Sequence, residues 1–321
     1  MTATKLKFSI FLPTLKRPDL LRKNLEALES QTRLPDEVLV SLRGDLDPEG
    51  VAVVDDFIAR TTSLSIVKVM LTEPGIVVAE NALLDAATGD VACLIDDDAI
   101  ARPSWMENIA RHYESDPNIG GVAGPPINIV DGKPEVKAAR YQNRVVFPGF
   151  ILDQSTRHSK QVVPSQHFRG ANMSLLISAL RNQGGFESRL LGDCFRYELD
   201  ACLGVSSQGY RLVFDPSAEV DHHEAPRILN TGRFDATAIH NNAANETFVL
   251  MKHYGFFGRL LHPPFAILVG NFPCPGLLWG ILGGIASLFC KNRFLLGFGA
   301  LLPAIKGRFT GFKMHFSNYS Q

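Results

Sequence analysis

The chain has 321 residues, of which 45% are hydrophobic and 20% charged, and its formal net charge is -1. These are the proportions of a globular protein with one large α/β domain or somewhat more, and we predict no nucleic-acid partner. The charge is unevenly distributed: residues 247–321 contain no acidic residue and carry +7, whereas residues 1–246 carry -8. This asymmetry points to an anionic partner surface for the C-terminal region.

The cysteines and the N-terminus indicate the compartment. Five cysteines are scattered without the spacing of a metal site, which favours a reducing compartment and argues against structural zinc. The first residues, MTATKLKFSIFL, include no long apolar segment before Lys16 and Arg17, so we expect no signal peptide. The folded part of the protein is therefore predicted to be cytoplasmic.

Strands and helices are predicted to alternate in the first hundred residues. Four apolar segments have the length of strands: residues 6–12, 37–42, 64–71 and 91–95. Helices are predicted between them, one that opens at Pro18 and two at residues 49–61 and 76–88. This alternation predicts a parallel, doubly wound sheet. Neither a G-x-G-x-x-G motif after the first strand nor a P-loop motif occurs, so dinucleotide and P-loop interpretations lack support.

The rest of the chain is less regular. Ser104 and Glu107 have the spacing of a capping box, which predicts a helix that runs to about Tyr113. Residues 140–166 show no clear periodicity, so we expect a long irregular segment that covers the substrate. Three more strands or strand-like segments are predicted, at residues 119–122, 167–174 and 210–214. Two more helices are predicted, a brief one at residues 177–183 and a longer one at residues 196–208.

Three consecutive carboxylates, Asp96, Asp97 and Asp98, follow directly after the apolar segment 91–95. The carboxyl end of a strand is where open α/β sheets bind ligands. In an extended chain Asp96 and Asp98 point to the same side, so a hard divalent cation (Mg²⁺ or Mn²⁺), shared with substrate phosphates, could relieve their repulsion. The alternative is a solvated acidic turn or the N-cap region of the next helix.

The ordered segments resemble the family 2 glycosyltransferases, which are inverting enzymes with the GT-A fold. The segments that carry the resemblance lie within residues 6–225: FLPTLKRPDLLRKNLEALESQT at 11–32, PDEVLVSL at 35–42, EPGIVVAENALLDAATGDVACLIDDDA at 73–99, FRGANMSLLISALRNQGGF at 168–186, FRYELDACLGVSSQGYRLVFDP at 195–216 and AEVDHH at 218–223. The resemblance implies an α/β, GT-A-type (Rossmann-like) fold, with a mostly parallel sheet flanked by helices. It predicts a glycosyltransferase domain at residues 1–225 and a helical C-terminal region at residues 226–321.

The resemblance also implies roles for single residues. The triplet matches the family's DxD-type element, with Asp96 and Asp97 beside the ribose and diphosphate of the donor and Asp98 as the principal metal ligand. His222 matches the histidine that can complete the metal and diphosphate site. Glu198 lies at the position of the general base, and Asp200 is the acidic residue two positions later. The other matched donor-binding positions are Pro13, Thr14, Arg17 and Asn81.

Two further donor-binding residues are candidates. The family commonly has Asp-Asp-Gly-Ser after its second strand, where this chain has Leu42-Arg43-Gly44-Asp45, so the base-recognising carboxylate is expected at Asp45. Arg169 could neutralise the diphosphate, because the guanidinium fork matches phosphate geometry. The alternative for Arg169 is an ordinary surface arginine.

The expected reaction is the inverting transfer of a sugar from a nucleotide-diphosphate sugar to a hydroxyl acceptor, a glycan or a lipid-linked molecule. The leaving diphosphate needs a Lewis acid, which a cation held by Asp98 would supply. The acceptor hydroxyl needs a general base to take its proton, and Glu198 is the candidate. Two other functions fit the residues: a phosphoaspartate-type phosphohydrolase that uses Asp96 and Asp98, and a non-catalytic nucleotide-sugar- or glycan-binding membrane protein. Structural alternatives are a solvated helix face for Glu198 and Asp200 and a strand-end histidine for His222.

The C-terminal region contains a long apolar stretch between basic flanks. Residues 263–290 include no charged residue and no histidine, but Asn271, prolines and glycines interrupt them. A spanning helix needs about 20 apolar residues, and a second apolar run at residues 294–305 is too short. We predict that residues 263–305 form a surface-lying or re-entrant anchor at the inner face of the cell membrane. A true span and an ordinary core or oligomer interface are the alternatives.

Overall fold

The computed structural model describes residues 5–139, 143–154, 156–223, 235–289 and 298–317, which form two compact units. The first unit consists of Met1–Asn143, Asp153–Phe186 and Ala201–Ile228. The second consists of Arg144–Leu152, Glu187–Asp200 and Leu229–Gln321. The units therefore differ from a single division after residue 225, because two earlier segments group with the C-terminal residues.

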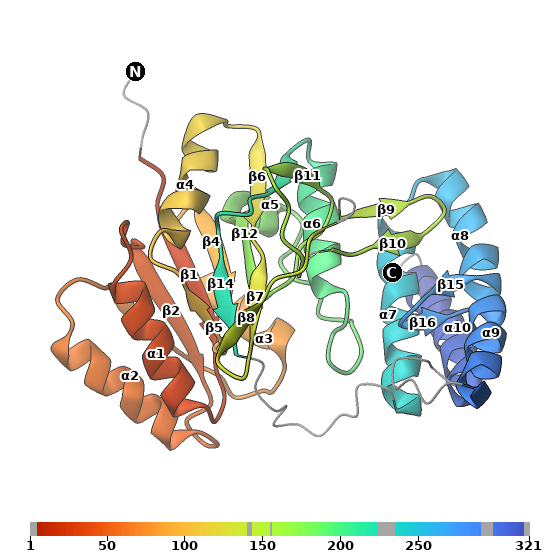
Figure 1. Cartoon of the computed structure of the whole chain (residues 1–321), viewed down its shortest axis with the longest axis horizontal. Coiled ribbons are helices and arrows are strands. Elements are labelled where there is room, and N and C mark those ends of the chain that lie inside the picture. The colour runs from red at the N-terminus through yellow and green to blue at the C-terminus, as the bar shows by residue number, and fades with distance from the viewer. Residues whose placement is uncertain (1–4, 140–142, 155, 224–234, 290–297, 318–321) are drawn as a thin grey trace. The chain divides into compact units, whose positions relative to one another are not determined.

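An eight-stranded sheet forms the centre of the first unit (Figure 1). From edge to edge its strands are β11 (Val163–Ser165), β13 (Arg211–Phe214), β6 (Ile119–Ala123), β12 (Asn172–Leu176), β4 (Val91–Ile95), β1 (Phe8–Pro13), β2 (Glu37–Leu42) and β3 (Ile66–Met70). Six of the eight strands pair in parallel with at least one neighbour: β1 with β2 and β4, β2 with β3, and β6 with β13. Strands β12 and β11 run antiparallel to their neighbours. The predicted α/β fold with a mostly parallel sheet is confirmed.

Helices bury the sheet of the first unit (Figure 1). Every residue of β2 and β4 is buried, as expected for central strands that are covered on both faces. Alternate residues of β1 join one apolar cluster with α1 (Pro18–Glu29), α2 (Pro48–Arg60) and α4 (Trp105–Ser115). Helix α3 (Ile76–Ala86) packs on β1, β2 and β3, and α5 (Ile177–Asn182) on β12. Because β1, β2 and β4 are parallel, their carboxyl ends meet at one edge of the sheet.

A smaller sheet lies next to the acidic triplet. It has the strand order β5 (Ala99–Ala101), β14 (Val220–His222), β7 (Pro126–Val130) and β8 (Lys133–Glu135). Strand β14 pairs antiparallel with β5, so that His222 lies opposite Ala99. It also pairs in parallel with β7, so that His222 lies opposite Asn128. This register brings His222 beside the residue that follows Asp98.

Two local predictions are wrong. Helix α4 begins at Trp105 as expected, but the Ser104 side chain makes no capping hydrogen bond, and Glu107 accepts a hydrogen bond from Thr32 Oγ1 at 2.8 Å instead. The capping box therefore does not form. Residues 140–166 were expected to be irregular, but the described part of this range contains three short strands: β9 (Arg144–Val146), β10 (Phe150–Leu152) and β11. Strands of three residues are too short to produce a recognisable period.

The second unit is mainly helical. Its helices are α7 (Ala236–His253), α8 (Phe256–Leu268), α9 (Leu277–Phe289), the 3₁₀ turn Phe298–Ala300 and α10 (Leu301–Phe316). The first turn of α6 (Tyr197–Ser207) also belongs to this unit. Its strands are the β9–β10 hairpin and the two-residue strands β15 (Gly270–Asn271) and β16 (Cys274–Pro275). Helices α7 and α10 approach closely, because Gly307 and Gly311 face α7: a Cβ atom at these positions would lie 2.2 Å from the His240 carbonyl oxygen and 2.4 Å from that of Ala244.

A buried ionic cluster lies inside the second unit. Arg308 and Glu246 are both fully buried and form an ion pair at 3.0 Å, and Arg196 contacts the same carboxylate at 2.8 Å. Burial raises the pKa of Glu246, but the two guanidinium groups outweigh this effect and hold the pKa below its usual value. The carboxylate is therefore charged, and the two guanidinium groups compensate for its burial.

Many large apolar side chains remain exposed on α8, α9 and α10. Phe256 and Phe257 at the start of α8 are 76% and 72% exposed, and Leu302 on α10 is 62% exposed. Across the ranges that the structure describes, no helix combines the length and the apolarity needed to cross a bilayer. Part of the second predicted apolar run, residues 294–297, lies outside the described residues.

Candidate functional site

The acidic triplet lies in a turn at the carboxyl end of β4, whose backbone is fixed by one buried side chain. The Ala99 amide donates to the Asp96 carbonyl oxygen at 3.0 Å, which closes the turn. Asn24 on α1 is fully buried, and its Nδ2 donates to the carbonyl oxygens of Asp96 at 3.0 Å and Ala99 at 2.8 Å. Helix α1 therefore determines how the three carboxylates are presented.

Asp96, Asp98 and His222 form a candidate metal site. Each offers one ligand atom, and these atoms lie within 4.8 Å of one another. His222 Nε2 lies 3.4 Å from Asp98 Oδ1, and the His223 amide donates to the Asp98 carbonyl oxygen at 2.8 Å. His222 Nδ1 lies 3.1 Å from Asn128 Oδ1, an acceptor, so the neutral imidazole keeps its Nε2 lone pair for a cation. Two carboxylates and one imidazole suit a divalent ion such as Mn²⁺.

The third carboxylate of the triplet has different partners. Asp97 is 5% exposed; it accepts hydrogen bonds from Arg17 Nη1 at 2.6 Å and Thr14 Oγ1 at 2.9 Å. Burial raises the pKa of Asp97 above its usual value, although Arg17 and Thr14 oppose this shift. Arg17 Nη1 also lies 3.2 Å from Asp98 Oδ2. The matched residues after β1 and after β4 are thus brought together.

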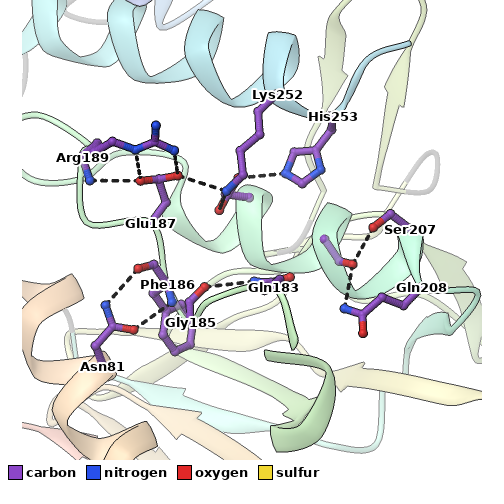
Figure 2. Close-up of polar contacts among 12 residues, drawn as sticks. Asn81, Gln183, Gly185, Phe186, Glu187, Arg189, Ser207, Gln208, Lys252 and His253 are labelled. Carbon is purple, nitrogen blue, oxygen red and sulfur yellow. Dashed lines mark hydrogen bonds and ion pairs between the residues drawn. The ribbon is translucent and has the colours of Figure 1, made fainter. Parts of the chain in front are cut away.

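The other predicted donor-binding residues lie in varied surroundings within the first unit. Pro13 ends β1, and Asp45, after β2, is exposed and forms two hydrogen bonds with Arg43. Arg169 is exposed and lies 3.3 Å from Asp153. Asn81 uses both atoms of its amide on the backbone of Phe186, at 2.9 and 2.8 Å, so it anchors that loop to α3 (Figure 2).

The two candidate catalytic carboxylates lie in the first turn of α6, in the second unit, and they differ in burial. Glu198 is partly exposed, whereas Asp200 is 1% exposed. Asp200 accepts hydrogen bonds from Lys252 Nζ at 2.9 Å and contacts His253 Nε2 at 2.8 Å, both at the end of α7. These contacts attach the start of α6 to α7.

A neighbouring carboxylate extends this network. Glu187 contacts Lys252 at 3.1 Å and forms hydrogen bonds with Arg189 (Figure 2). Burial raises the pKa of Glu187, but Arg189 and Lys252 outweigh this effect and lower the pKa to about 2. Glu187 is therefore a charged carboxylate that is fully engaged in holding Lys252 beside Asp200.

Sequence reasoning missed Asn24, Asn128, Lys252 and His253. Asn24 carried a signal, because it is a polar residue on the apolar face of α1 formed by Leu21, Leu25 and Leu28. The other three contact their partners through long-range pairing, for which the sequence offers no local pattern.

The comparisons with known proteins identify the family. The profile of Glycosyl transferase family 2 matches residues 9–179, more than half of the chain, and the chain belongs to this family. The protein is therefore an enzyme that transfers sugars. Family membership removes the support for the phosphohydrolase and the non-catalytic alternatives.

Relatives in sequence are glycosyltransferases. The chain is 26% identical over 225 residues to the glucosyl-dolichyl phosphate glucuronosyltransferase of Haloferax volcanii, with 68% of this chain and 69% of that protein covered. It is 27% identical over 291 residues to the pre-mycofactocin glycosyltransferase of Mycobacterium tuberculosis, with 79% of this chain covered. The match spans 59% of the length of the mycobacterial protein.

Solved structures show the same fold. The mannosyltransferase PcManGT from Pyrobaculum calidifontis, in complex with GDP-Man and Mn²⁺, has a TM-score of 0.58 at 15% identity, with 97% of this chain and 88% of that chain covered. GalNAc-T7 with UDP, GalNAc and Mn²⁺ has a TM-score of 0.63 at 13% identity, with 82% and 50% covered. These likenesses support the GT-A-type fold.

Proposed function

We propose that the enzyme transfers a sugar from a nucleotide-diphosphate sugar to a hydroxyl acceptor with the help of a divalent cation. The observation that carries the proposal is the group of Asp96, Asp98 and His222 at the carboxyl end of β4, whose ligand atoms lie within 4.8 Å of one another. The nucleotides and Mn²⁺ in the titles of the two structural neighbours support the same class of donor.

The residues of the first unit suggest how the donor is held. A cation bound by Asp98, Asp96 and His222 would supply Lewis-acid stabilisation of the leaving diphosphate. The imidazole favours Mn²⁺ over Mg²⁺, because Mg²⁺ prefers oxygen ligands. We assign Arg17, whose Nη1 lies 2.6 Å from Asp97 Oδ1 and 3.2 Å from Asp98 Oδ2, to the phosphates of the donor. Asp45 is the candidate for base recognition.

We assign the role of general base to Glu198. In a direct displacement it takes the proton of the acceptor hydroxyl as the oxygen bonds to the anomeric carbon and the bond to the diphosphate breaks, which inverts that carbon. Partial exposure of Glu198 suits a group that must meet an acceptor. The contacts of Asp200 with Lys252 and His253 favour a positioning role, since they fix the helical turn that carries Glu198.

The acceptor is proposed to be a glycan or a lipid-linked molecule at the cytoplasmic face of a membrane. The name of the Haloferax volcanii relative includes a glucosyl-dolichyl phosphate. The exposed apolar side chains of α8, α9 and α10 and the excess of basic residues after Glu246 suit a surface with apolar and anionic groups.

A screen of nucleotide sugars by thermal shift, with and without Mn²⁺, tests the class of donor. A ligand at a hundred times its Kd stabilises a protein by about 2.7 kcal/mol, so one donor should raise the melting temperature clearly, and only with the cation. Asp98→Asn should lose this metal-dependent part, whereas exposed Asp85→Asn should retain it. If no nucleotide produced a metal-dependent shift, the proposal would be wrong.

The same donor then tests the base and the stereochemistry. Glu198→Gln should bind the donor within about twofold of the unmodified enzyme and lose at least about 100-fold in kcat, because a general base contributes factors of this size. NMR of the freshly formed product should show the anomeric configuration opposite to that of the donor. Retention of configuration, or unchanged turnover in Glu198→Gln, would contradict the assignment.

A further inference from the structure

We propose that Arg17 is a tethered counter-ion that couples the binding of the cation to the binding of the donor diphosphate. This inference rests on the proposed function and concerns the regulation of the same site. Before the cation binds, Arg17 pairs with both Asp97 and Asp98. When the cation takes Asp98, the guanidinium turns to the diphosphate.

The first observation is that Asp98 is shared. Arg17 Nη1 lies 3.2 Å from Asp98 Oδ2, and His222 Nε2 lies 3.4 Å from Asp98 Oδ1. Asp98 also belongs to the group that can hold a metal ion. A cation bound there must therefore use a carboxylate that a guanidinium already neutralises. Two positive charges on one carboxylate repel each other, so Arg17 competes with the cation.

The second observation is that the two contacts of Arg17 are unequal. The distance to Asp97 Oδ1 is 2.6 Å, shorter than the 3.2 Å to Asp98. Asp97 is buried and also accepts a hydrogen bond from Thr14 at 2.9 Å. Asp97 is thus the firm partner of Arg17, and the contact with Asp98 is the one that can be released while Arg17 stays at the site.

The third observation is that the backbone at Arg17 is fixed while its side chain reaches the surface. Lys16 has a φ of 54°, and its amide donates to Asp47 Oδ2 at 2.6 Å. The Leu21 amide donates to the Arg17 carbonyl oxygen at 3.0 Å, which starts α1. The Arg17 side chain is 20% exposed, and its planar fork of donors suits a diphosphate. Its guanidinium can therefore change partner without a backbone movement.

The consequence is positive coupling between two ligands. The cation releases Arg17 from Asp98, which makes the guanidinium available to the diphosphate, and the diphosphate in turn removes the charge that opposes the cation. Binding of either ligand must then strengthen binding of the other by the same factor. Without Arg17 the cation loses a competitor and the diphosphate loses a partner.

Electron paramagnetic resonance of free Mn²⁺ measures cation binding directly, without turnover. Titrations with and without UDP or GDP would compare the unmodified protein with Arg17→Gln and with Arg17→Lys, which keeps the charge. Arg22→Gln is the matched control, because Arg22 lies on α1, the helix that begins directly after Arg17, and pairs with Asp56 at 3.0 Å on the surface. If Arg17→Gln does not fold, Arg17→Met removes the charge and keeps much of the volume.

We expect Arg17→Gln to bind Mn²⁺ alone at least about fivefold more tightly than the unmodified protein. In this variant, the factor by which Mn²⁺ strengthens nucleotide binding should fall at least about fivefold. Arg17→Lys and Arg22→Gln should bind Mn²⁺ alone within about twofold of the unmodified protein. Equal or weaker binding of Mn²⁺ by the neutral variant would overturn the inference about Arg17 but would not affect the proposed function. If the unmodified protein bound neither Mn²⁺ nor a nucleotide, the proposed function itself would fail.

Discussion

At the scale of single residues, the partners of a buried carboxylate decide what it does in this protein. Asp97 and Asp215 are both buried, yet burial raises the pKa of Asp97, whereas the pKa of Asp215 is lowered to about 2. Burial also acts to raise the pKa of Asp215, but hydrogen bonds from His112 and Ser217 outweigh it. The bond lengths are 2.6 Å to His112 Nε2 and 2.8 Å from the Ser217 amide. Asp215 is therefore a structural anion at the end of β13.

Replacement of Asp215 tests this assignment. The folded-state pKa is about 2 and an unfolded carboxyl titrates near 3.9, so the charged form contributes about 2–3 kcal/mol of stability. Because the folded pKa is the lower one, this contribution is present above about pH 4 and is lost as the pH falls toward 2. Urea unfolding should show Asp215→Asn to be about 2–3 kcal/mol less stable at pH 7, with the difference shrinking toward pH 2. A difference independent of pH, or an equal loss in exposed Asp85→Asn, would contradict it.

The candidate site also shows what the sequence could predict at this scale. The acidic triplet after an apolar strand predicted that Asp96 and Asp98 could share a cation, and the structure places ligand atoms of these two residues and His222 within 4.8 Å of one another. The different partners of Asp97 were not predictable, because Thr14 and Arg17 reach it only through the pairing of β1 with β4. Whether a carboxylate of the triplet contacts Arg17, belongs to the candidate cation site or does both depends on that long-range geometry.

At the scale of elements, prediction succeeded where a period or a boundary residue was present. The predicted strand at residues 37–42 coincides with β2, and the helix predicted to open at Pro18 is α1. The capping box at Ser104 failed because Glu107 found a tertiary partner in Thr32. The β9–β10 hairpin was missed because its strands are short and only partly buried, so no alternation was visible.

The contact between α7 and α10 yields an element-scale prediction. A Cβ atom at Gly311 would lie 2.4 Å from the Ala244 carbonyl oxygen and 2.8 Å from Thr247 Cβ, so Gly311→Ala forces the helices apart. The overpacking cost, about 1–3 kcal/mol, exceeds the gain in helix propensity. Thermal unfolding should show a clear loss of stability. Gly299→Ala is the control and should be neutral or stabilising, because no atom of the described residues, apart from the chain neighbours of Gly299, lies within 4 Å of the added carbon.

At the scale of the whole molecule, the basic residues of the C-terminal region have two different roles: some are exposed on the surface, and at least one pairs with a buried carboxylate. The seven basic residues after Glu246 were all assigned to a partner surface by sequence, but Arg308 is fully buried against Glu246. Lys306 and Lys313, on the same helix, are exposed. A count of charges cannot separate a buried counter-ion from a surface cation, because that distinction depends on which face of α10 packs on α7.

The exposed apolar and basic groups of the second unit lead to the last prediction, that the protein binds anionic vesicles. Phe256 and Phe257 are more than 70% exposed, and burying a phenylalanine side chain in an apolar phase contributes about 1.5–3 kcal/mol. The double variant Phe256→Ser/Phe257→Ser should therefore weaken vesicle binding at least about tenfold. A double change of exposed apolar residues in the first unit, Val130→Ser/Val136→Ser, is the matched control and should have no effect.

Sedimentation with vesicles of phosphatidylcholine, with and without phosphatidylglycerol, separates the two contributions. Binding should be stronger with the anionic lipid and weaker at high salt, because exposed charges are screened over a Debye length of about 10 Å at 0.1 M salt. The loss in the phenylalanine variant should persist at high salt, since apolar burial does not depend on screening. Equal sedimentation of both double variants would show that Phe256 and Phe257 do not contribute to vesicle binding and would contradict the prediction.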